Sequence, residues 1–588
     1  MNENDLKEMI LVAQSLIENY NDFFKNPNKV IPENIKDTYL NLATSFLNDN
    51  EKTKSTELQE LCKTIRQNLE EAEIKINSHN QNIKDSTVQN EIIYAGVHSN
   101  KLEIIKEKID KLLEKNINRK EILIIPYTNK DVKELNNQIN PTNEIKISTI
   151  NNLVLELINK SASENIKIQN TNVEGFIKDK LNSLLKEDTY LSKLCKYLIH
   201  YHFKRKNDLE FTSDKEKDNY YKLNKPLTFN NELVHNFDEV DIANFLYENQ
   251  INYKYEDDKF NLPDYNITIK YLLNQSEENN DIICYAKEKL EGKLLTNLYN
   301  NLKTHQVAFN PRQANELWND ILSKNPNIID SIVELYQTII TQLISSNQTL
   351  ETFNTSLQNK KLIELVSPIY NDYLANLKDN EINNLINKAI YLIKEQDFNY
   401  KYIIVDEAMN LTTNNYNFIK ELINHCNASY TLLGKVEECI YQTNGSNPKY
   451  LLDNNVRKVS PEQNSEIKEE ISSNIDETLN TLPENSTVLL AIRYPGDIKL
   501  LNENYEINSQ NIIYKNRKDL NIKFILARRC KEEQADYTII IKDNNRLLEA
   551  PIINQIMGIE LDLEKLLYYN VCLTASKNVY LYEHKASN

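Results

Sequence analysis

Two adjacent carboxylates that follow an apolar run are the strongest chemical signal in this sequence. The segment YIIVDEA places Asp406 and Glu407 directly after the run YIIV. Such a run predicts a buried strand, and parallel α/β sheets hold their ligands at the carboxyl ends of strands. One carboxylate can hold Mg²⁺ while the other polarises a water for attack on a γ-phosphate. A strand followed by a helix cap would have the same residues, so this interpretation needs a partner motif.

The partner motif lies upstream in AGVHSNKL, residues 95–102. It approximates GxxxxGK[ST], the loop whose backbone amides cradle phosphates. Gly96 and Lys101 fit this pattern, whereas Asn100 replaces the second glycine and Leu102 replaces the hydroxyl residue. The two motifs together predict a nucleotide-binding site.

The surrounding sequence predicts the parallel sheet that these motifs require. Apolar strands at 91–97, 121–127 and 145–150 alternate with amphipathic helices at 101–115 and 130–139. This order is typical of a parallel α/β sheet. The pattern returns in further strands at 400–408 and 429–434, and then in a last block at 486–494, 521–529, 536–543 and 578–584.

We therefore expect an α/β protein with two parallel-sheet domains, the first of which is split by a large, mainly helical insertion. In residues 1–80 the apolar residues recur near i, i+3, i+4 and i+7, and this spacing predicts helices. The remaining expected parts, in chain order, are a first core at 81–155, the insertion at 156–384 with a small α/β island at about 225–272, the second part of the first core at 385–455, and a second core at 456–588.

Composition limits the functional classes. The 588 residues carry a formal net charge of −17, which repels nucleic acid at long range, so any nucleic-acid contact requires a local basic groove. No apolar run approaches the roughly 20 residues of a membrane span. No signal peptide is visible, and the seven cysteines include no CxxC pair. We expect a cytoplasmic protein without a membrane partner.

At several motifs the chain resembles the UvrD-like superfamily 1 helicases, and within them the helicase IV-like branch. EILIIPYTNKDVKELNNQI is similar to the family's ILxxTFTNKAAKEMxxRI, and YKYIIVDEAMNLTTNNYNFIKELI to YxxIxVDEAQDLSxxxxxLIxxL. TLLGKVEECIYQTNGS resembles VGDDxQSIYxFRGA, and LLYYNVCLTASKNVYLY resembles RLFYVALTRAKxxVYLL. The resemblance implies two RecA-like P-loop domains, ATP and Mg²⁺ as cofactors, and single-stranded DNA as a partner.

The resemblance also assigns roles to residues of this sequence. Lys101, Asp406 and Glu407 are the implied catalytic residues, and Asp406 is the implied Mg²⁺ ligand. The implied nucleotide-binding residues are Gln81, which fits the glutamine that reads adenine, together with Gly96, Lys101, Thr128, Gly434 and Tyr441. We expect Lys101 and Asp406 to face each other across a cleft between the two cores, with Tyr441 placed to stack on a base.

The island within the insertion resembles a nuclease-like module of helicase IV-type proteins. Glu239 fits the first acid of a PD-(D/E)xK site, but Lys259 and Lys270 stand where the metal-binding acids belong. Two lysines repel a divalent cation, so the resemblance implies a degenerate island without nuclease activity.

Several departures from the family concern hydrolysis. Leu102 offers no hydroxyl to Mg²⁺, and Lys435 and Glu438 replace the family's acid and γ-phosphate-sensing glutamine. Gln442 replaces the family's arginine after Tyr441, and Ala575 stands where the family's last motif has another arginine. Such an arginine contributes on the order of 10³–10⁵ in rate.

Three hypotheses stay open. The first is a pseudohelicase or scaffold that binds nucleotide weakly or binds DNA, the second an active ATP-dependent 3′–5′ translocase, and the third a protein-interaction module that kept the fold. The intact set of Lys101, Asp406 and Glu407 favours the second hypothesis. The replacement of the family's hydroxyl residue by Leu102, combined with the loss of both arginines, favours the first. The sequence leaves open whether ATP is hydrolysed, which partner is bound and what the N-terminal helices do.

Overall fold

The computed structural model describes residues 3–583 except 24–30, 51–54, 87–88, 97–98, 162–165, 170, 203–225, 273–280, 291, 460–467, 473, 502, 509 and 543–549. The chain forms two compact units. The first contains residues 1–168, 382–440 and 446–466, and the second contains 169–381, 441–445 and 467–588. Within the described residues, no helix combines the length and the apolar character needed to cross a membrane.

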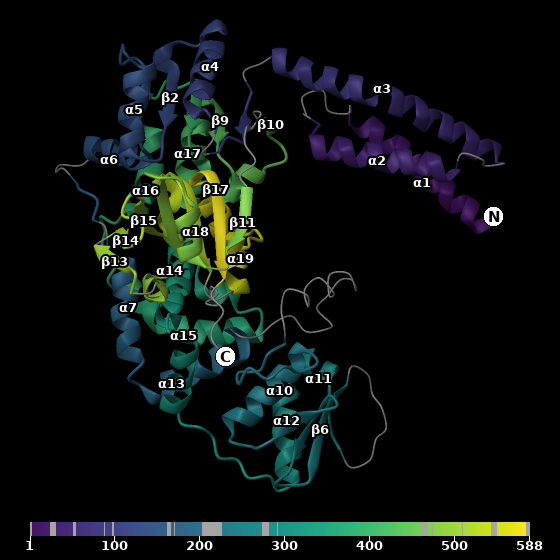
Figure 1. The fold of residues 1–588 in the computed structure, drawn as a ribbon. Coiled ribbons are helices and arrows are strands. Elements are labelled where there is room, and N and C mark those ends of the chain that lie inside the picture. The colour runs from purple at the N-terminus through teal and green to yellow at the C-terminus, as the bar shows by residue number, and fades with distance from the viewer. Residues whose placement is uncertain are drawn as a thin grey trace. The chain divides into compact units, whose positions relative to one another are not determined.

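A six-stranded parallel sheet forms the centre of the first unit (Figure 1), with the strand order β10-β1-β9-β8-β2-β3. Its strands are β1 (Glu91–Ile93), β2 (Ile122–Ile125), β3 (Lys146–Ile147), β8 (Tyr402–Val405), β9 (Ser429–Leu433) and β10 (Arg457–Val459). The prediction that the segments 91–97 and 400–408 share a sheet is confirmed, because β1 and β8 both pair with β9. One strand differs from expectation: β10 falls in the range assigned to the second core, yet it pairs with β1.

Helices cover both faces of this sheet. Alternate strand residues, such as Ile122 and Ile404, pack with α4 (Lys101–Glu114) and α5 (Asn129–Ile139). Their neighbours, such as Leu123 and Ile403, pack with α6 (Ile150–Ser161), α16 (Ile382–Leu392) and α17 (Thr413–Cys426). Burial on both faces explains why β2 and β8 are continuous apolar runs and not alternating sequences.

The N-terminal helices pack around an apolar cluster of their own. They are α1 (Glu3–Asp22), α2 (Glu33–Asn50) and α3 (Thr56–Ser86), and the buried cluster includes Ala13, Tyr39 and Ile65. The predicted helical character of residues 1–80 agrees with these elements, and α3 continues to Ser86.

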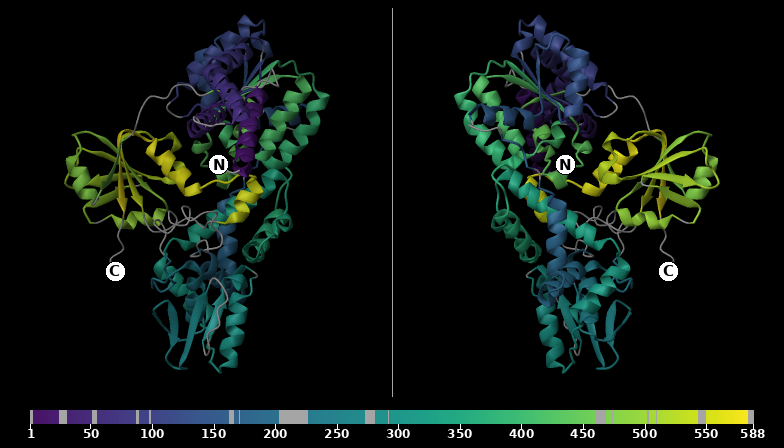
Figure 2. Two further views of the ribbon diagram at one scale, coloured as in Figure 1. Left: turned by 90° about the vertical axis from the view of Figure 1, so that its right-hand side faces the viewer. Right: turned by 90° about the vertical axis from the view of Figure 1, so that its left-hand side faces the viewer.

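A seven-stranded sheet lies in the second unit and is drawn in yellow-green in Figure 2, with the order β11-β17-β16-β12-β15-β14-β13. Its strands are β11 (Lys468–Ser472), β12 (Thr487–Ile492), β13 (Tyr505–Asn508), β14 (Asn511–Tyr514), β15 (Asn521–Leu526), β16 (Ala535–Lys542) and β17 (Ala575–Glu583). The first five strands of that order run parallel, and β14 and β13 add an antiparallel edge. The associated helices are α18 (Ile475–Thr481), α19 (Pro551–Met557) and α20 (Leu563–Cys572).

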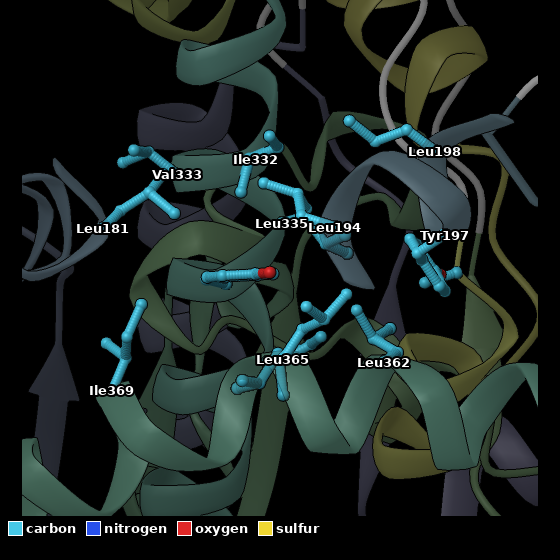
Figure 3. Close-up of a cluster of buried hydrophobic side chains, with 14 of the residues drawn as sticks. Leu181, Leu194, Tyr197, Leu198, Ile332, Val333, Leu335, Leu362, Leu365 and Ile369 are labelled. Atoms are coloured by element: carbon cyan, nitrogen blue, oxygen red, sulfur yellow. The ribbon is translucent and has the colours of Figure 1, made fainter. Parts of the chain in front are cut away.

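Helices of the insertion belong to the same unit as this second sheet. They are α7 (Val173–Leu184), α8 (Asp188–Tyr197), α13 (Ala314–Lys324), α14 (Ile328–Ser346) and α15 (Leu357–Ala375). Figure 3 shows part of their shared core, in which Leu194, Ile332 and Leu365 meet from three helices. Residues of α19 join this cluster, so one apolar core contains both insertion helices and a helix of the C-terminal region. The sequence predicted a mainly helical insertion at 156–384, but not this packing.

The small island is a four-stranded sheet with helices packed on one face (Figure 1). Its strands are β4 (Lys254–Glu256), β5 (Lys259–Leu262), β6 (Ile267–Leu272) and β7 (Ile282–Tyr285), of which β7 runs parallel to β6. Alternate residues such as Phe260 and Ile269 pack with α10 (Phe237–Glu248) and α12 (Leu294–Thr304).

Candidate functional site

The carboxyl edge of the first sheet brings Lys101, Asp406 and Glu407 together. Lys101 opens α4 after β1, and the two carboxylates follow β8. The Lys101 Nζ donates to Oε1 of Glu407 at 3.2 Å and lies 3.5 Å from Oδ1 of Asp406. We expected Lys101 and Asp406 to face each other across a cleft between two cores; instead both belong to the first unit and form a direct ion pair.

Burial and charge act against each other at these residues. Burial lowers the pKa of Lys101, but the charges of Asp406, Glu407 and Glu438 outweigh it, so the net pKa lies above the ordinary value. Burial raises the pKa of Asp406, and Lys101 opposes this rise only in part. The lysine is therefore held in its charged form, while the carboxylate is in an environment that disfavours its charge.

Glu407 sits on unusual backbone. Its φ of 52° lies in the left-handed region, which costs a residue with a side chain about 1 kcal/mol or more. Its backbone N–H donates to Oδ1 of Asp406 at 2.7 Å, and Asn410 Nδ2 donates to its Oε2 at 2.7 Å. These bonds fix the carboxylate beside Lys101 at the turn after β8.

The predicted phosphate loop uses several of its own groups as hydrogen-bond partners. The N–H of Gly96 donates to Oγ of Ser99 at 3.0 Å. Asn100 is the N-cap of α4, and its Oδ1 accepts the N–H of Glu103 at 3.4 Å. Backbone N–H groups at such a loop and helix start are those that a bound phosphate would use. Residues 97–98, between Gly96 and Ser99, lie outside the described part of the structure.

Leu102 belongs to the apolar packing and not to the polar edge. Its side chain is partly buried against the cluster that contains Ile105 and Ile109. The position at which the phosphate-loop pattern has a hydroxyl residue therefore supplies no ligand for Mg²⁺.

A third carboxylate, that of Glu438, lies against Gly96 of the loop. It ends the short 3₁₀ helix Val436–Glu438 that follows β9, and 1% of its surface is exposed. A Cβ built on Gly96 would overlap Oε1 of Glu438 and lie 3.0 Å from Cδ of Lys435. The missing side chain at Gly96 thus leaves the room that the Glu438 carboxylate occupies.

Thr128 and Gly434, two of the predicted nucleotide-binding residues, have clear structural roles at this edge. Thr128 is the N-cap of α5: its Oγ1 accepts the N–H of Asp131 at 3.2 Å and donates to Oδ2 of Asp131 at 2.6 Å. A Cβ on Gly434 would lie 2.8 Å from Sδ of Met409, so the chain leaving β9 can pass the turn after β8 because residue 434 is a glycine.

Two further predicted residues are not assembled with this set. Gln81 lies in α3, and its side chain lies outside the described part of the structure. Tyr441 belongs to the second unit, where the Lys531 Nζ lies 5.7 Å from the centre of its ring. Arg528, in the same unit, donates to Oε1 of Glu174 at 3.4 Å.

Sequence reasoning missed two residues near the carboxylates. Partial burial, and then the charge of Glu407, raises the pKa of Tyr127, which is still 38% exposed, and the charge of Asp131 contributes to the raised pKa of Asp406. Tyr127 lies two residues after the end of β2, which pairs with β8, so its place near a strand end was the available signal.

These residues do not fit Mg·ATP in the arrangement that hydrolysis needs. Lys101 suits a phosphate, and Asp406 suits a magnesium ion, but Leu102 is packed into the core and Glu438 adds a third negative charge. Among the described residues, no group of three or more His, Cys, Asp or Glu side chains is arranged to hold a metal ion.

The described residues of the island present no alternative acidic centre. Lys259 and Lys270 pair in register across β5 and β6, and Lys270 forms an ion pair with Asp281. Glu239 is 1% exposed and accepts the Tyr255 hydroxyl at 2.6 Å, and burial raises its pKa. Because side chains alternate along a strand, Phe260 faces α10, the helix of Glu239, whereas Lys259 faces the other side of the sheet.

Comparison with known proteins gives one family match. The profile of the UvrD/REP helicase N-terminal domain matches residues 76–458, which include the loop at Gly96 and the Asp406–Glu407 turn. None of the curated proteins matches the chain.

Proposed function

The chain belongs to the UvrD/REP helicase family, and from this premise we propose that it is a helicase homologue with impaired ATP hydrolysis. It acts as a pseudohelicase or scaffold that binds nucleotide or single-stranded DNA. ATP and Mg²⁺, the cofactors that helicases of this family generally use, bind weakly at most. We place it in the cytoplasm.

One observation carries this proposal: Lys101 pairs with Asp406 and Glu407, and the charge of a third, buried acid, Glu438, also acts on it. In a working phosphate site the lysine neutralises phosphate charge, and an added acid opposes that role. Two backbone N–H groups beside it already donate to side chains, that of Gly96 to Ser99 and that of Glu103 to Asn100. Both features weaken the binding of a triphosphate and of its transition state.

The resemblance to the family supports the loss of turnover independently. No arginine occurs at residues 442–444 after Tyr441, and Ala575 stands in the last motif. Loss of one transition-state arginine by about 10³-fold costs roughly 4 kcal/mol, so loss of both brings hydrolysis near background.

Steady-state ATP hydrolysis of the full chain, with and without single-stranded DNA, tests the proposal. We expect no DNA-stimulated rate, and the same background in Glu407→Gln as in the unmodified protein. A robust DNA-stimulated rate that Glu407→Gln abolishes would contradict the proposal and favour the active 3′–5′ translocase.

The translocase is the second candidate because Lys101, Asp406 and Glu407 are retained and in contact. A protein-interaction module is the third. Fluorescence anisotropy with a labelled single strand, together with calorimetry with nucleotide, separates it from the first two, since a module that kept the fold alone would bind neither ligand.

We extend the proposal to the domain organisation. The two sheets are RecA-like cores, the first at 81–155 and 385–455 and the second at 456–588, apart from β10. The island near 225–272 is a degenerate nuclease-like module whose Lys270 pairs with Asp281 in place of a metal ion.

A further inference from the structure

Glu438 is an acid at a site whose ligand, a phosphate, would itself be negatively charged. It is a buried acid whose carboxylate lies against the backbone of Gly96, the first glycine of the phosphate loop. Its charge acts on Lys101 together with the charges of Asp406 and Glu407. The position of this acid has a consequence for which nucleotide can bind.

The lysine of a phosphate loop reaches the β- and γ-phosphates, and the paired acids after the neighbouring strand face the γ-phosphate and its metal ion. A γ-phosphate beside Lys101 would therefore lie next to Asp406 and Glu407, whose charges a magnesium ion offsets, and it would also be repelled by the charge of Glu438, which acts on Lys101. Like charges repel, and water screens this repulsion least at a carboxylate that is 1% exposed, as that of Glu438 is. A nucleoside diphosphate lacks the group that this repulsion acts on.

We propose that Glu438 makes this site select a nucleoside diphosphate over a nucleoside triphosphate. The inference rests on the proposed function, because it assumes that nucleotide binds at Lys101. It goes further by naming the ligand class and the residue that sets the choice. Lys435, whose side chain also reaches Gly96, attracts the phosphates of either nucleotide and does not set the ratio.

Isothermal titration calorimetry on the full chain in excess Mg²⁺ tests the inference, with ADP and the non-hydrolysable analogue AMP-PNP as probes. The unmodified protein should bind ADP at least tenfold more tightly than AMP-PNP. Glu438→Gln keeps the size of the side chain and removes its charge, so the ratio should fall to within threefold of unity. Lys101→Ala should lose both ligands.

The adjacent Glu437 provides the matched control, because it is exposed and carries the same charge. Glu437→Gln should leave the ratio unchanged. Thermal unfolding checks that each variant is folded, and Glu438→Ala serves as the second variant if Glu438→Gln is not. Equal affinities for ADP and AMP-PNP in the unmodified protein, or an unchanged ratio in folded Glu438 variants, would overturn the inference.

Failure of the inference can be separated from failure of the proposed function. If neither nucleotide binds any of the proteins, the inference is overturned, while the proposed function stands or falls on the DNA-binding and hydrolysis measurements. If hydrolysis is robust, the proposed function fails whatever the ratio of affinities.

Discussion

At the scale of single residues, Lys101 and Asp406 show how the two partners of one ion pair can differ, because the charge of the lysine is favoured and that of the carboxylate is disfavoured. The ammonium group is surrounded by acids that hold it charged. The Asp406 side chain is only 13% exposed, and Glu407 repels its charge from the next position, so its pKa is raised even though Lys101 is 3.5 Å away. Residues with such shifts concentrate at functional sites because selection there is not for stability.

This raised pKa gives a signed prediction for stability. A carboxyl whose pKa in the folded state is higher than its ordinary 3.8 lowers the free energy of unfolding once it is charged. This penalty disappears below pH 3.8, where the group is protonated in both the folded and the unfolded state. Asp406→Asn removes the charge, so we expect a higher thermal midpoint than the unmodified protein at about pH 7. The two midpoints should converge as the pH falls below 3.8.

Differential scanning calorimetry across this pH range provides the measurement. Asp179→Asn, which changes an acid of α7 in the other unit, is the control for net charge. A lower midpoint for Asp406→Asn at neutral pH would mean that the ion pair with Lys101 outweighs the burial of the carboxyl.

At the scale of elements, the helices of the insertion are held by a close-packed apolar core. Leu365 of α15 is 1% exposed and lies in the cluster of Figure 3 with residues of α8 and α14. Cores packed to this extent relax only in part when atoms are removed, so the cost of a cavity adds to the lost burial.

Leu365→Ala should therefore lower the free energy of unfolding by about 2–5 kcal/mol. The same substitution at Leu374, on the same helix but 41% exposed, should cost much less. Urea denaturation followed by circular dichroism gives both values. Equal costs at the two positions would show that α15 does not pack in the way described.

At the scale of the whole molecule, the insertion is joined to the second sheet by a buried ion pair. Arg493 lies just after β12, and its Nη2 donates to both carboxylate oxygens of Glu334 of α14, at 3.0 and 2.9 Å. Its Nε donates to Oε1 of Glu564 at 3.1 Å. Nearby, Ser331 donates to the Tyr494 hydroxyl at 2.9 Å. These contacts tie α14 to the end of β12 across 159 positions of sequence.

Arg493→Met should cost about 3–5 kcal/mol of stability, because it leaves Glu334 charged and buried at 5% exposure. Glu564 is the matched partner to compare: its side chain is 36% exposed, so Glu564→Gln should cost no more than about 1 kcal/mol. Chemical denaturation measures both. If Arg493→Met is as mild as Glu564→Gln, the pair does not hold the insertion to the sheet.

The sequence by itself determined five of the six strands of the first sheet and part of the site. The runs around Ile124 and Ile404 are apolar on both faces, which specifies buried parallel strands. Residues that follow the ends of such strands lie at the carboxyl edge of the sheet, where α/β proteins bind their ligands. Lys101, Asp406 and Glu407 were predicted for that reason, and they meet.

The tertiary structure decided what depends on contacts between distant segments. No local pattern places Glu438 against Gly96, draws β10 into the first sheet or packs α14 on the end of β12. Each of these results from side-chain packing and buried charge pairing, which depend on the shapes of both partners and not on the periodicity of either. For the same reason the resemblance to the family indicated only that residue 438 is a glutamate in place of the usual glutamine, whereas the structure shows where the carboxylate of Glu438 lies.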